Sequence, residues 1–418
     1  MDLNTFVAEI VGIVPPWRVV SAEFDGVDTV DVEIEYVRTM RSPAPCCPEC
    51  GGRCSYYDMV DKSWRHTDMC DQICRIHGKV PRIRCGGCGK VSRMEVPWAS
   101  ESISRYTSSF ESKVVGLARE MPVSAVCREM RIDDSTVWTI LDRYVARRME
   151  GQDLSAVSTY YVDEKAIHKG HTYLSTFLDQ NRDVIYVGEG NSSDTVSGFR
   201  DHLESRGGTA GGIRHISSDM GSGYLKGARE CFPDARVTLD RFHVTKHMTE
   251  AVNDTRRREY AALTDGQAEE RAMLKGQRYL FLKNYNNLDD SRKEILPGLL
   301  AAFPDLGRIY VFKESMRGFW EMPTRYDGGM FVRRWCSEAR ATDVPELVRI
   351  VNMVEGILNW YDSRISNGVM EAFNSVLQAF KGRARGYRSL ERYRTMIYLR
   401  SCSLCRDDVR GRCPTPSP

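Results

Sequence analysis

The stretch TYYVDEKAIHKGHTYLSTFLDQNRDVIYVGEG, residues 159–190, decides the fold of the largest part of this 418-residue chain. It holds three runs of apolar, β-branched and aromatic residues separated by short polar turns, a pattern that predicts consecutive antiparallel strands. Downstream, the sequence predicts a helix over about 194–205, a strand in the apolar run 213–219, a helix near 224–231 and a strand over 235–240. The predicted order of elements is therefore β-β-β-α-β-α-β.

This order is that of the ribonuclease H-like fold, in which the first strand lies at the centre of the sheet beside the fourth. Residues at the ends of these two strands then become neighbours in space. Asp163 is expected at the end of the first strand and Asp219 at the end of the fourth. Glu164 comes next in the chain, but alternation along a strand should point it to the opposite face from Asp163. The two aspartates are therefore candidates for one site.

A long helical region separates this core from a third acid. Residues from about 244 to 355 are charged and show helical rather than strand periodicity. A further helix, starting near residues 366–367, carries Glu371. We therefore predict an α/β multidomain protein whose ribonuclease H-like catalytic domain spans 158–400 and is interrupted by this α-helical insertion. A disordered tail is expected at 407–418.

The three acids Asp163, Asp219 and Glu371 form a suitable ligand set for catalytic Mg²⁺ or Mn²⁺. Phosphoryl transfer without a covalent intermediate needs an activated water or 3′-hydroxyl and a stabilised leaving oxygen. Two metal ions about 3.5–4 Å apart can supply both. Because Mg²⁺ keeps several waters and takes only a few carboxylates, acids from two strand ends and one helix suffice. A single acid at a strand end is more often a turn residue, so the prediction rests on the combination.

Cysteine spacing predicts a second, structural metal site near the N-terminus. The pairs Cys47-x-x-Cys50 and Cys85-x-x-Cys88 are each followed by glycine, which a tight metal-binding turn allows. Four thiolates in a closed site suit Zn²⁺, and fourteen cysteines are too few here for a disulfide-stapled scaffold. The region contains further candidate ligands: Cys46, Cys54, His66, Cys70, Cys74 and His77. We assign 1–100 to a zinc-binding module, in which alternating apolar residues predict a strand or hairpin before the cysteines.

Residues 101–150 are predicted to form a helix-turn-helix domain. The segment PVSAVCREMRIDDSTVWTILDRYV, residues 122–145, gives a short helix, a tight turn and a longer helix capped by Asp134 or Ser135. Apolar residues of the longer helix share one face: Val137, Ile140, Leu141 and Val145. A simple helical hairpin is the alternative. If the longer helix reads DNA, three side chains would face the major groove: Ser135, Thr136 and Thr139.

Charge is informative through its distribution, because the net charge is only +2. One basic stretch, Lys79–Arg93, contains no acid, and a second contains a single acid, Glu391. The second stretch contains Lys381, Arg383, Arg385, Arg388, Arg392, Arg394 and Arg400. Such patches attract phosphates, although a solvated helix face is the ordinary alternative for either one. Of these residues, the four nearest to Glu371 are candidates for contacts with DNA phosphates.

No apolar run approaches the roughly 18 residues of a membrane span, and the acidic start lacks the basic flank of a signal peptide. We therefore expect a cytoplasmic protein with no membrane partner.

Three runs closely resemble the catalytic domain of ISL3-family insertion-sequence transposases. They are VDEKAIHKGHTYLSTFLD (162–179), SSDMGSGYLKGARECFPDARVTLDRFHV (217–244) and NGVMEAFNSVLQAFKGRARGYRS (367–389). The likeness extends to the C-x-x-C module and the helix-turn-helix, and so covers most of the chain, although the extra cysteines depart from the family pattern.

The resemblance implies a DDE transposase with the catalytic triad Asp163, Asp219 and Glu371. It places Asp240 and His243, from the run DRFH, beside the site. His243 could orient the scissile phosphate or tune a carboxylate, and a structural hydrogen bond is the alternative. The implied partners are double-stranded DNA, as terminal inverted repeats and target, and further copies of the chain, as a homodimer or higher oligomer in the synaptic complex. The implied location is the bacterial cytoplasm, in association with the nucleoid.

Two rival functions follow from the same residues. A ribonuclease H-like, structure-specific nuclease would explain the carboxylates, but not the two modules suited to reading DNA that precede them. A transposase-derived DNA-binding regulator would keep those modules and lose a catalytic acid, whereas all three acids are present. End cleavage and strand transfer are therefore the predicted activities.

Overall fold

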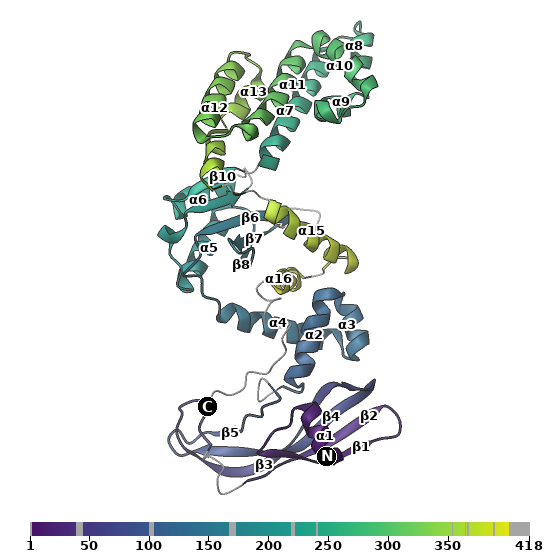
Figure 1. Ribbon diagram of the computed structural model, residues 1–418, viewed down its shortest axis with the longest axis vertical. Helices are drawn as coiled ribbons and strands as arrows, with labels where there is room; N and C mark the ends of the chain where they lie inside the picture. Colours follow the sequence, from purple (N-terminus) through teal and green to yellow (C-terminus); the bar gives the residue numbers. More distant parts are fainter. Residues whose placement is uncertain are drawn as a thin grey trace. The chain divides into compact units, whose positions relative to one another are not determined.

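The computed structural model describes residues 2–38, 45–99, 104–166, 173–218, 222–239, 241–352, 354–363, 365, 368–387 and 389–400 (Figure 1). The tail predicted at 407–418 lies outside these residues. Contacts within the chain divide it into two compact units, with the boundary between Arg147 and Arg148. In the described part, no helix is both long and apolar enough to cross a membrane.

The first unit opens with helix α1 (Leu3–Val11) and a five-stranded sheet. The strands are β1 (Trp17–Phe24), β2 (Thr29–Tyr36), β3 (Cys54–Met69), β4 (Gln72–Cys85) and β5 (Val91–Arg93). Their order is β1-β2-β4-β3, with β5 paired to β4. The strand or hairpin expected before the cysteines is confirmed, because β1 and β2 pair antiparallel. Three tryptophans anchor the core under this sheet: Trp17, Trp64 and Trp98.

Three helices complete the first unit: α2 (Ser108–Glu120), α3 (Val123–Met130) and α4 (Asp134–Glu150). The apolar face predicted for the longer helix is buried. The predicted cap was wrong, because α4 is capped by Asp133, whose Oδ1 accepts a hydrogen bond from the Thr136 N–H at 2.8 Å. Hydrogen bonds from Ser135 and Thr136 also lower the pKa of the Asp133 carboxyl, and the charged form is the one that caps best.

The second unit contains the predicted five-stranded sheet. Its strands are β6 (Thr159–Ala166), β7 (Tyr173–Asp179), β8 (Val184–Glu189), β9 (His215–Ser218) and β10 (Arg236–Leu239). The order is β10-β9-β6-β7-β8, so the first strand lies beside the fourth as expected. β6, β7 and β8 pair antiparallel, whereas β9 is parallel to both β6 and β10.

Helices α5 (Ser193–Ser205) and α6 (Ser222–Cys231) connect these strands, and a short 3₁₀ turn, η1 (Ala210–Gly212), precedes β9. Aromatic side chains dominate the core between sheet and helices. Tyr160 of β6 meets Phe199 of α5 edge-on, with ring centroids 4.9 Å apart, and Phe177 of β7 stacks on Phe199 at 4.5 Å. These contacts bury the strands that carry the candidate acids and so fix their positions.

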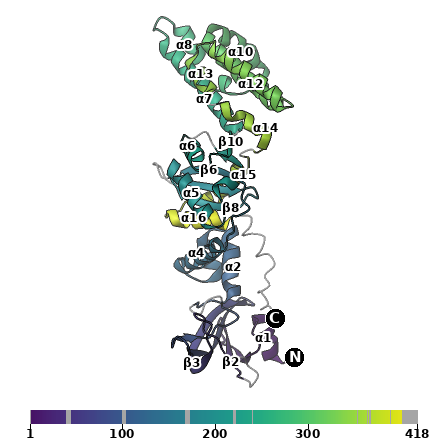
Figure 2. The ribbon, with the colours of Figure 1, turned by 90° about the vertical axis from the view of Figure 1, so that its left-hand side faces the viewer.

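Between β10 and the helix that carries Glu371, the described residues form helices only. The α-helices are α7 (Arg241–Ala262), α8 (Ala268–Leu274), α9 (Arg278–Leu282), α10 (Asp290–Ala302), α11 (Pro304–Met316), α12 (Arg325–Arg340), α13 (Pro345–Val351) and α14 (Trp360–Ser363). Short 3₁₀ turns lie at η2 (Tyr285–Asn287), η3 (Arg317–Glu321) and η4 (Val354–Asn359). Figure 2 shows α7, α8, α10, α12 and α13 gathered together.

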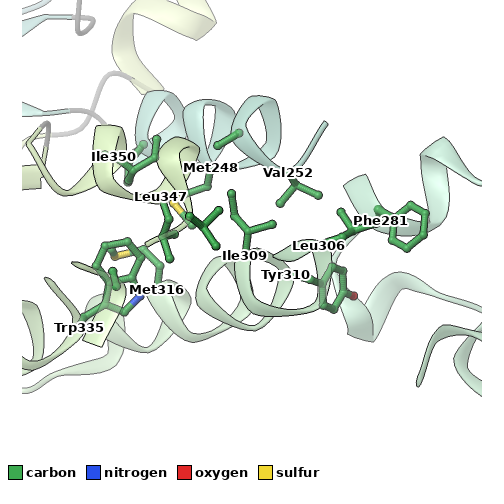
Figure 3. Packing of buried hydrophobic residues seen from close by; sticks show 14 of the residues in the cluster. Met248, Val252, Phe281, Leu306, Ile309, Tyr310, Met316, Trp335, Leu347 and Ile350 are labelled. Atoms are coloured by element: carbon green, nitrogen blue, oxygen red, sulfur yellow. The ribbon is translucent and has the colours of Figure 1, made fainter. Parts of the chain in front are cut away.

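This bundle has its own hydrophobic core (Figure 3). Met248 and Val252 of α7 face Leu306 and Ile309 of α11, and all four side chains are buried. The last two helices, α15 (Gly368–Arg383) and α16 (Leu390–Leu399), return to the sheet. There α15 contacts β6, and the Tyr398 hydroxyl of α16 accepts a hydrogen bond from the Val187 N–H of β8 at 2.9 Å.

Candidate active site and cysteine cluster

Asp163 lies in β6, paired with Thr176 of β7. Among the described residues, the parallel pairing of β6 with β9 runs up to Val162 and Ser218, the residues that precede Asp163 and Asp219. The strand itself runs on to Ala166, so the prediction that Asp163 ends the strand was wrong. Its side chain is half-buried. Asp219 follows Ser218 in the chain and lies outside the described residues.

Asn374 joins this strand to the helix that carries Glu371. Its buried side-chain amide donates a hydrogen bond from Nδ2 to Oδ2 of Asp163. The other oxygen of Asp163 accepts from the Glu164 N–H at 2.8 Å. Glu371 precedes Asn374 by three residues and therefore lies on the same side of α15. The contact thus brings the turn that holds Glu371 alongside Asp163.

Sequence reasoning did not find Asn374. One signal was available, since Glu371-x-x-Asn374 places two polar side chains one turn apart on the same helix face. Polar residues at that spacing are common on solvated faces, so the signal alone was weak.

Glu371 is exposed and borders a cavity of about 410 Å³. The cavity also touches α7, α11 and η3, so it lies between the helical bundle and the start of α15. Cations and an aromatic ring contribute to its wall: Arg241, Lys313, Arg317 and Trp320. Basic side chains therefore lie beside Glu371 in this wall.

The four predicted cysteines converge. The sulfur atoms of Cys47, Cys50, Cys85 and Cys88 all lie within 4.8 Å of one another. The Sγ atoms of Cys47 and Cys88 are 3.7 Å apart, and those of Cys50 and Cys85 are 3.4 Å apart. Four sulfurs around one Zn²⁺ at about 2.3 Å would be separated by about 3.8 Å. The cluster is therefore compatible with zinc.

The glycine after each pair has the conformation that such a turn requires. Gly51 and Gly89 have φ of 69° and 71°, in the left-handed region that side chains disfavour. Their N–H groups donate to the carbonyls of Cys47 and Cys85, at 3.0 and 3.1 Å. The two halves of the cluster thus repeat one local structure.

Backbone N–H groups also stabilise thiolate at the cluster. The N–H groups of Cys88 and Gly87 lie 3.4 and 3.3 Å from the Cys85 sulfur and lower the pKa of that thiol to about 6. The two competing histidines are engaged elsewhere. His66 shares a hydrogen bond with Thr107 at 2.9 Å, and burial lowers its pKa to about 4, while His77 bonds Asp31 at 2.6 Å.

Comparison with protein families assigns the chain. A family model described as "Transposase" and named for the DDE transposases of ISL3 matches residues 161–397. The model described as the helix-turn-helix domain of transposase family ISL3 matches residues 94–145. The first match alone covers more than half of the chain.

The chain belongs to the ISL3 family of transposases.

Curated relatives agree. The transposase for insertion sequence element IS1001 of Bordetella parapertussis is 25% identical over 351 residues, which cover 82% of this chain and 86% of the relative. The transposase for insertion sequence element IS1557 of Mycobacterium tuberculosis is 28% identical over 372 residues, covering 82% of each chain, and the same figures hold in strains CDC 1551 and H37Rv.

The structure places the remaining predicted residues of this ISL3-family chain as follows. His243 is half-buried in the first turn of α7, and Asp240 lies outside the described residues. Near the start of α4, Ser135 and Thr139 are exposed and Thr136 is half-buried. Their hydroxyls have local partners: those of Ser135 and Thr136 bond the Asp133 carboxylate, and that of Thr139 bonds the Ser135 carbonyl at 2.8 Å.

The basic stretch after Glu371 has two parts. Lys381, Arg383 and Arg385 lie at the end of α15 and in the turn that follows, with both arginines exposed. In contrast, Arg394 on α16 pairs with Glu189 of β8 at 2.6 Å and so holds the helix to the sheet. Arg388 lies outside the described residues. Arg383 and Arg385 are therefore accessible to DNA phosphates. Arg394 instead holds α16 to β8.

Proposed function

We propose that this chain is a DDE transposase that binds the terminal inverted repeats of its own insertion sequence and catalyses metal-dependent end cleavage and strand transfer. One observation carries the proposal: Asn374 of the helix that presents Glu371 donates a hydrogen bond to Asp163 of β6. The sheet order and strand directions support a ribonuclease H-like fold for this domain.

Asp163, Asp219 and Glu371 would hold the catalytic Mg²⁺ or Mn²⁺. The donor set fits, because hard divalent cations prefer carboxylate oxygens. Asp163 accepts hydrogen bonds from the Glu164 N–H on one oxygen and from the Asn374 amide on the other, which would orient its carboxylate. When bound, the metal would activate the attacking hydroxyl and stabilise the leaving oxygen. Asp163 is bonded to both the strand and the helix, and these contacts would keep its oxygens aimed at one point.

The other modules would bring DNA to this site. Cys47, Cys50, Cys85 and Cys88 would hold one structural Zn²⁺. α4 would read the major groove with its exposed N-terminal residues, and Lys381, Arg383, Arg385 and Arg388 would bind phosphates near the reacting end. Because two ends must be joined, at least two copies of the chain would act together.

A plasmid that carries the gene with its native flanks tests this function. Purified protein and Mg²⁺ should produce breaks that map to inverted repeats bounding the gene, and Asp219→Asn protein should produce none. Binding at these repeats without any break by the wild type would instead favour a DNA-binding regulator. Breaks at branched DNA regardless of sequence would favour a structure-specific nuclease.

Asn374→Ala should slow end cleavage by about 10- to 100-fold, as loss of a group that orients a metal ligand commonly does. The Mg²⁺ concentration for half-maximal rate should rise, because Asp163 would lose the donor that fixes its rotamer. Asn374→Asp would place a second carboxylate against Asp163, and like charges disfavour ionisation, so the acidic limb of the pH–rate profile should move to higher pH. Single-turnover rates at several Mg²⁺ concentrations and pH values measure both effects.

Gln378→Ala is the matched control for Asn374, since it removes an exposed carboxamide one turn farther along α15. Its Mg²⁺ dependence should match that of the wild type. An unchanged Mg²⁺ dependence in Asn374→Ala would show that the contact with Asp163 has no role in metal binding.

A further inference from the structure

The cavity beside Glu371 has a composition that the metal site does not explain. Its volume is about 410 Å³, and its wall joins α7, α11, η3 and the first turns of α15. Such a space is in the range of small-molecule sites and is far too narrow for a duplex. Whatever enters it lies next to one of the proposed metal ligands.

Arg241 is the cation in this wall that is left for an anion. It is exposed, and among the described residues it forms no ion pair. Its guanidinium lies 5.5 Å from the centroid of the Trp320 ring. Arg317, in contrast, pairs with Glu314 at 3.3 Å. The buried Lys313 ammonium is also satisfied, because it pairs with Glu314 at 3.0 Å and bonds the carbonyls of Phe281 and Lys283.

The other notable part of the wall is apolar. Met248 and Met316 line the cavity together with Trp320. The indole is held by edge-on contacts with Phe319 and Trp360, at 4.8 and 5.4 Å between ring centroids. A fixed aromatic ring offers a surface to any nucleobase, and methionine side chains adapt to its outline. An arginine that forms no ion pair with a described residue, next to an apolar floor, matches a phosphate with its base.

We propose that this cavity receives a single nucleotide of the DNA strand beside the scissile phosphate, extruded from the duplex, with its phosphate on Arg241 and its base against Trp320. The inference rests on the proposed function, because only a catalytic Glu371 places the scissile phosphate beside this cavity. A nucleotide held at this point would fix the position of the scissile phosphate with respect to the carboxylates. Extrusion also exposes a strand end that stacking would otherwise shield.

Trp320→Ala should slow single-turnover cleavage of a fully paired end by about 5- to 150-fold, the range expected for loss of one base–aromatic stack. Trp320→Phe keeps an aromatic surface and should retain most of the rate. Arg241→Gln should slow cleavage while Lys246→Gln, which removes a charge from the same helix outside the cavity, should not. Arg241 is exposed, so its replacement tests the cavity even if Trp320→Ala is poorly folded.

Photocrosslinking tests the contact directly and does not require cleavage. End duplexes carrying 5-iodouracil at successive positions around the mapped break are bound to full-length protein in Ca²⁺ and irradiated. One position should crosslink to the segment containing Met316 and Trp320, and a mismatch at that position should speed cleavage by the wild type. Crosslinks only to other segments, or unchanged rates in both Trp320→Ala and Arg241→Gln, would overturn the assignment. Crosslinking at this segment in a chain that never cleaves DNA would reject the proposed function and keep the nucleotide site.

Discussion

Asp163→Asn protein should bind its DNA ends as tightly as the wild type and cleave them about 10³-fold more slowly or not at all. The amide preserves shape and the contact with α15, but it removes the charge that would hold a divalent cation. Glu371→Gln should have the same effect, because Glu371 presents its carboxylate from the helix that Asn374 holds against β6. Single-turnover cleavage and gel-shift titrations on the mapped end separate catalysis from binding.

Glu164→Gln is the matched control for this prediction. It makes the same kind of change at the next position of β6, where strand alternation turns the side chain away from Asp163. Its cleavage rate should stay close to that of the wild type. Equal loss of activity in both variants would indicate a general effect of charge on the strand and would contradict the assignment of Asp163.

Loss of metal from the cysteine cluster should unfold the N-terminal module and abolish end binding. Structural zinc sites contribute about 10–16 kcal/mol in small peptides, as much as the whole stability of a typical domain. Cys50→Ser, or a zinc chelator, should therefore remove hydrogen-exchange protection from β3 and β4. Protection should persist in β6 and β9, which belong to the other compact unit. Exchange measured by mass spectrometry reports both regions in one experiment.

Cys46→Ser provides the control for the cluster, because Cys46 is exposed, adjacent to Cys47 and not part of the quartet. It should leave both exchange and binding unchanged. Chelated protein that still bound its ends with undiminished affinity would show that the metal is not needed for recognition.

The strands of the second unit were predictable because the residues within each run favour the extended conformation. Runs such as 184–189 contain β-branched and aromatic residues that suit a buried strand and few that suit a helix. The position of Asp163 was only partly predictable. The composition predicts the strand, but β6 runs on to Ala166 beside β7, and the end of a strand depends on its partners in the tertiary structure.

Other parts depended on choices among chemically similar residues. Asp133, Asp134 and Ser135 can all cap a helix, and only the hydrogen bond to the Thr136 N–H selects the first. Among the cysteines, Cys54 pairs with Cys85 and packs against the cluster, yet the four sulfurs that lie together are those predicted from spacing.

The contact between Asn374 and Asp163 joins residues 211 positions apart, and the cavity beside Glu371 is lined by residues from 241 to 371. Neither has a local signature, because both arise when α15 returns to the sheet beside the helical bundle. Periodicity and spacing relate residues within one helix or strand, whereas these two sites combine residues from several helices and strands.

The most direct test of the proposed carboxylate site is to let Fe²⁺ occupy it and cut the polypeptide beside its ligands. With ascorbate and peroxide, bound iron generates radicals that break nearby backbone, and mass spectrometry locates the breaks. We expect cuts beside residues 163, 219 and 371 that excess Mg²⁺ suppresses and that Asp163→Asn weakens at all three places. Cuts confined to the cysteine cluster, or a set that leaves one of the three segments intact, would contradict the convergence of these acids on one metal site.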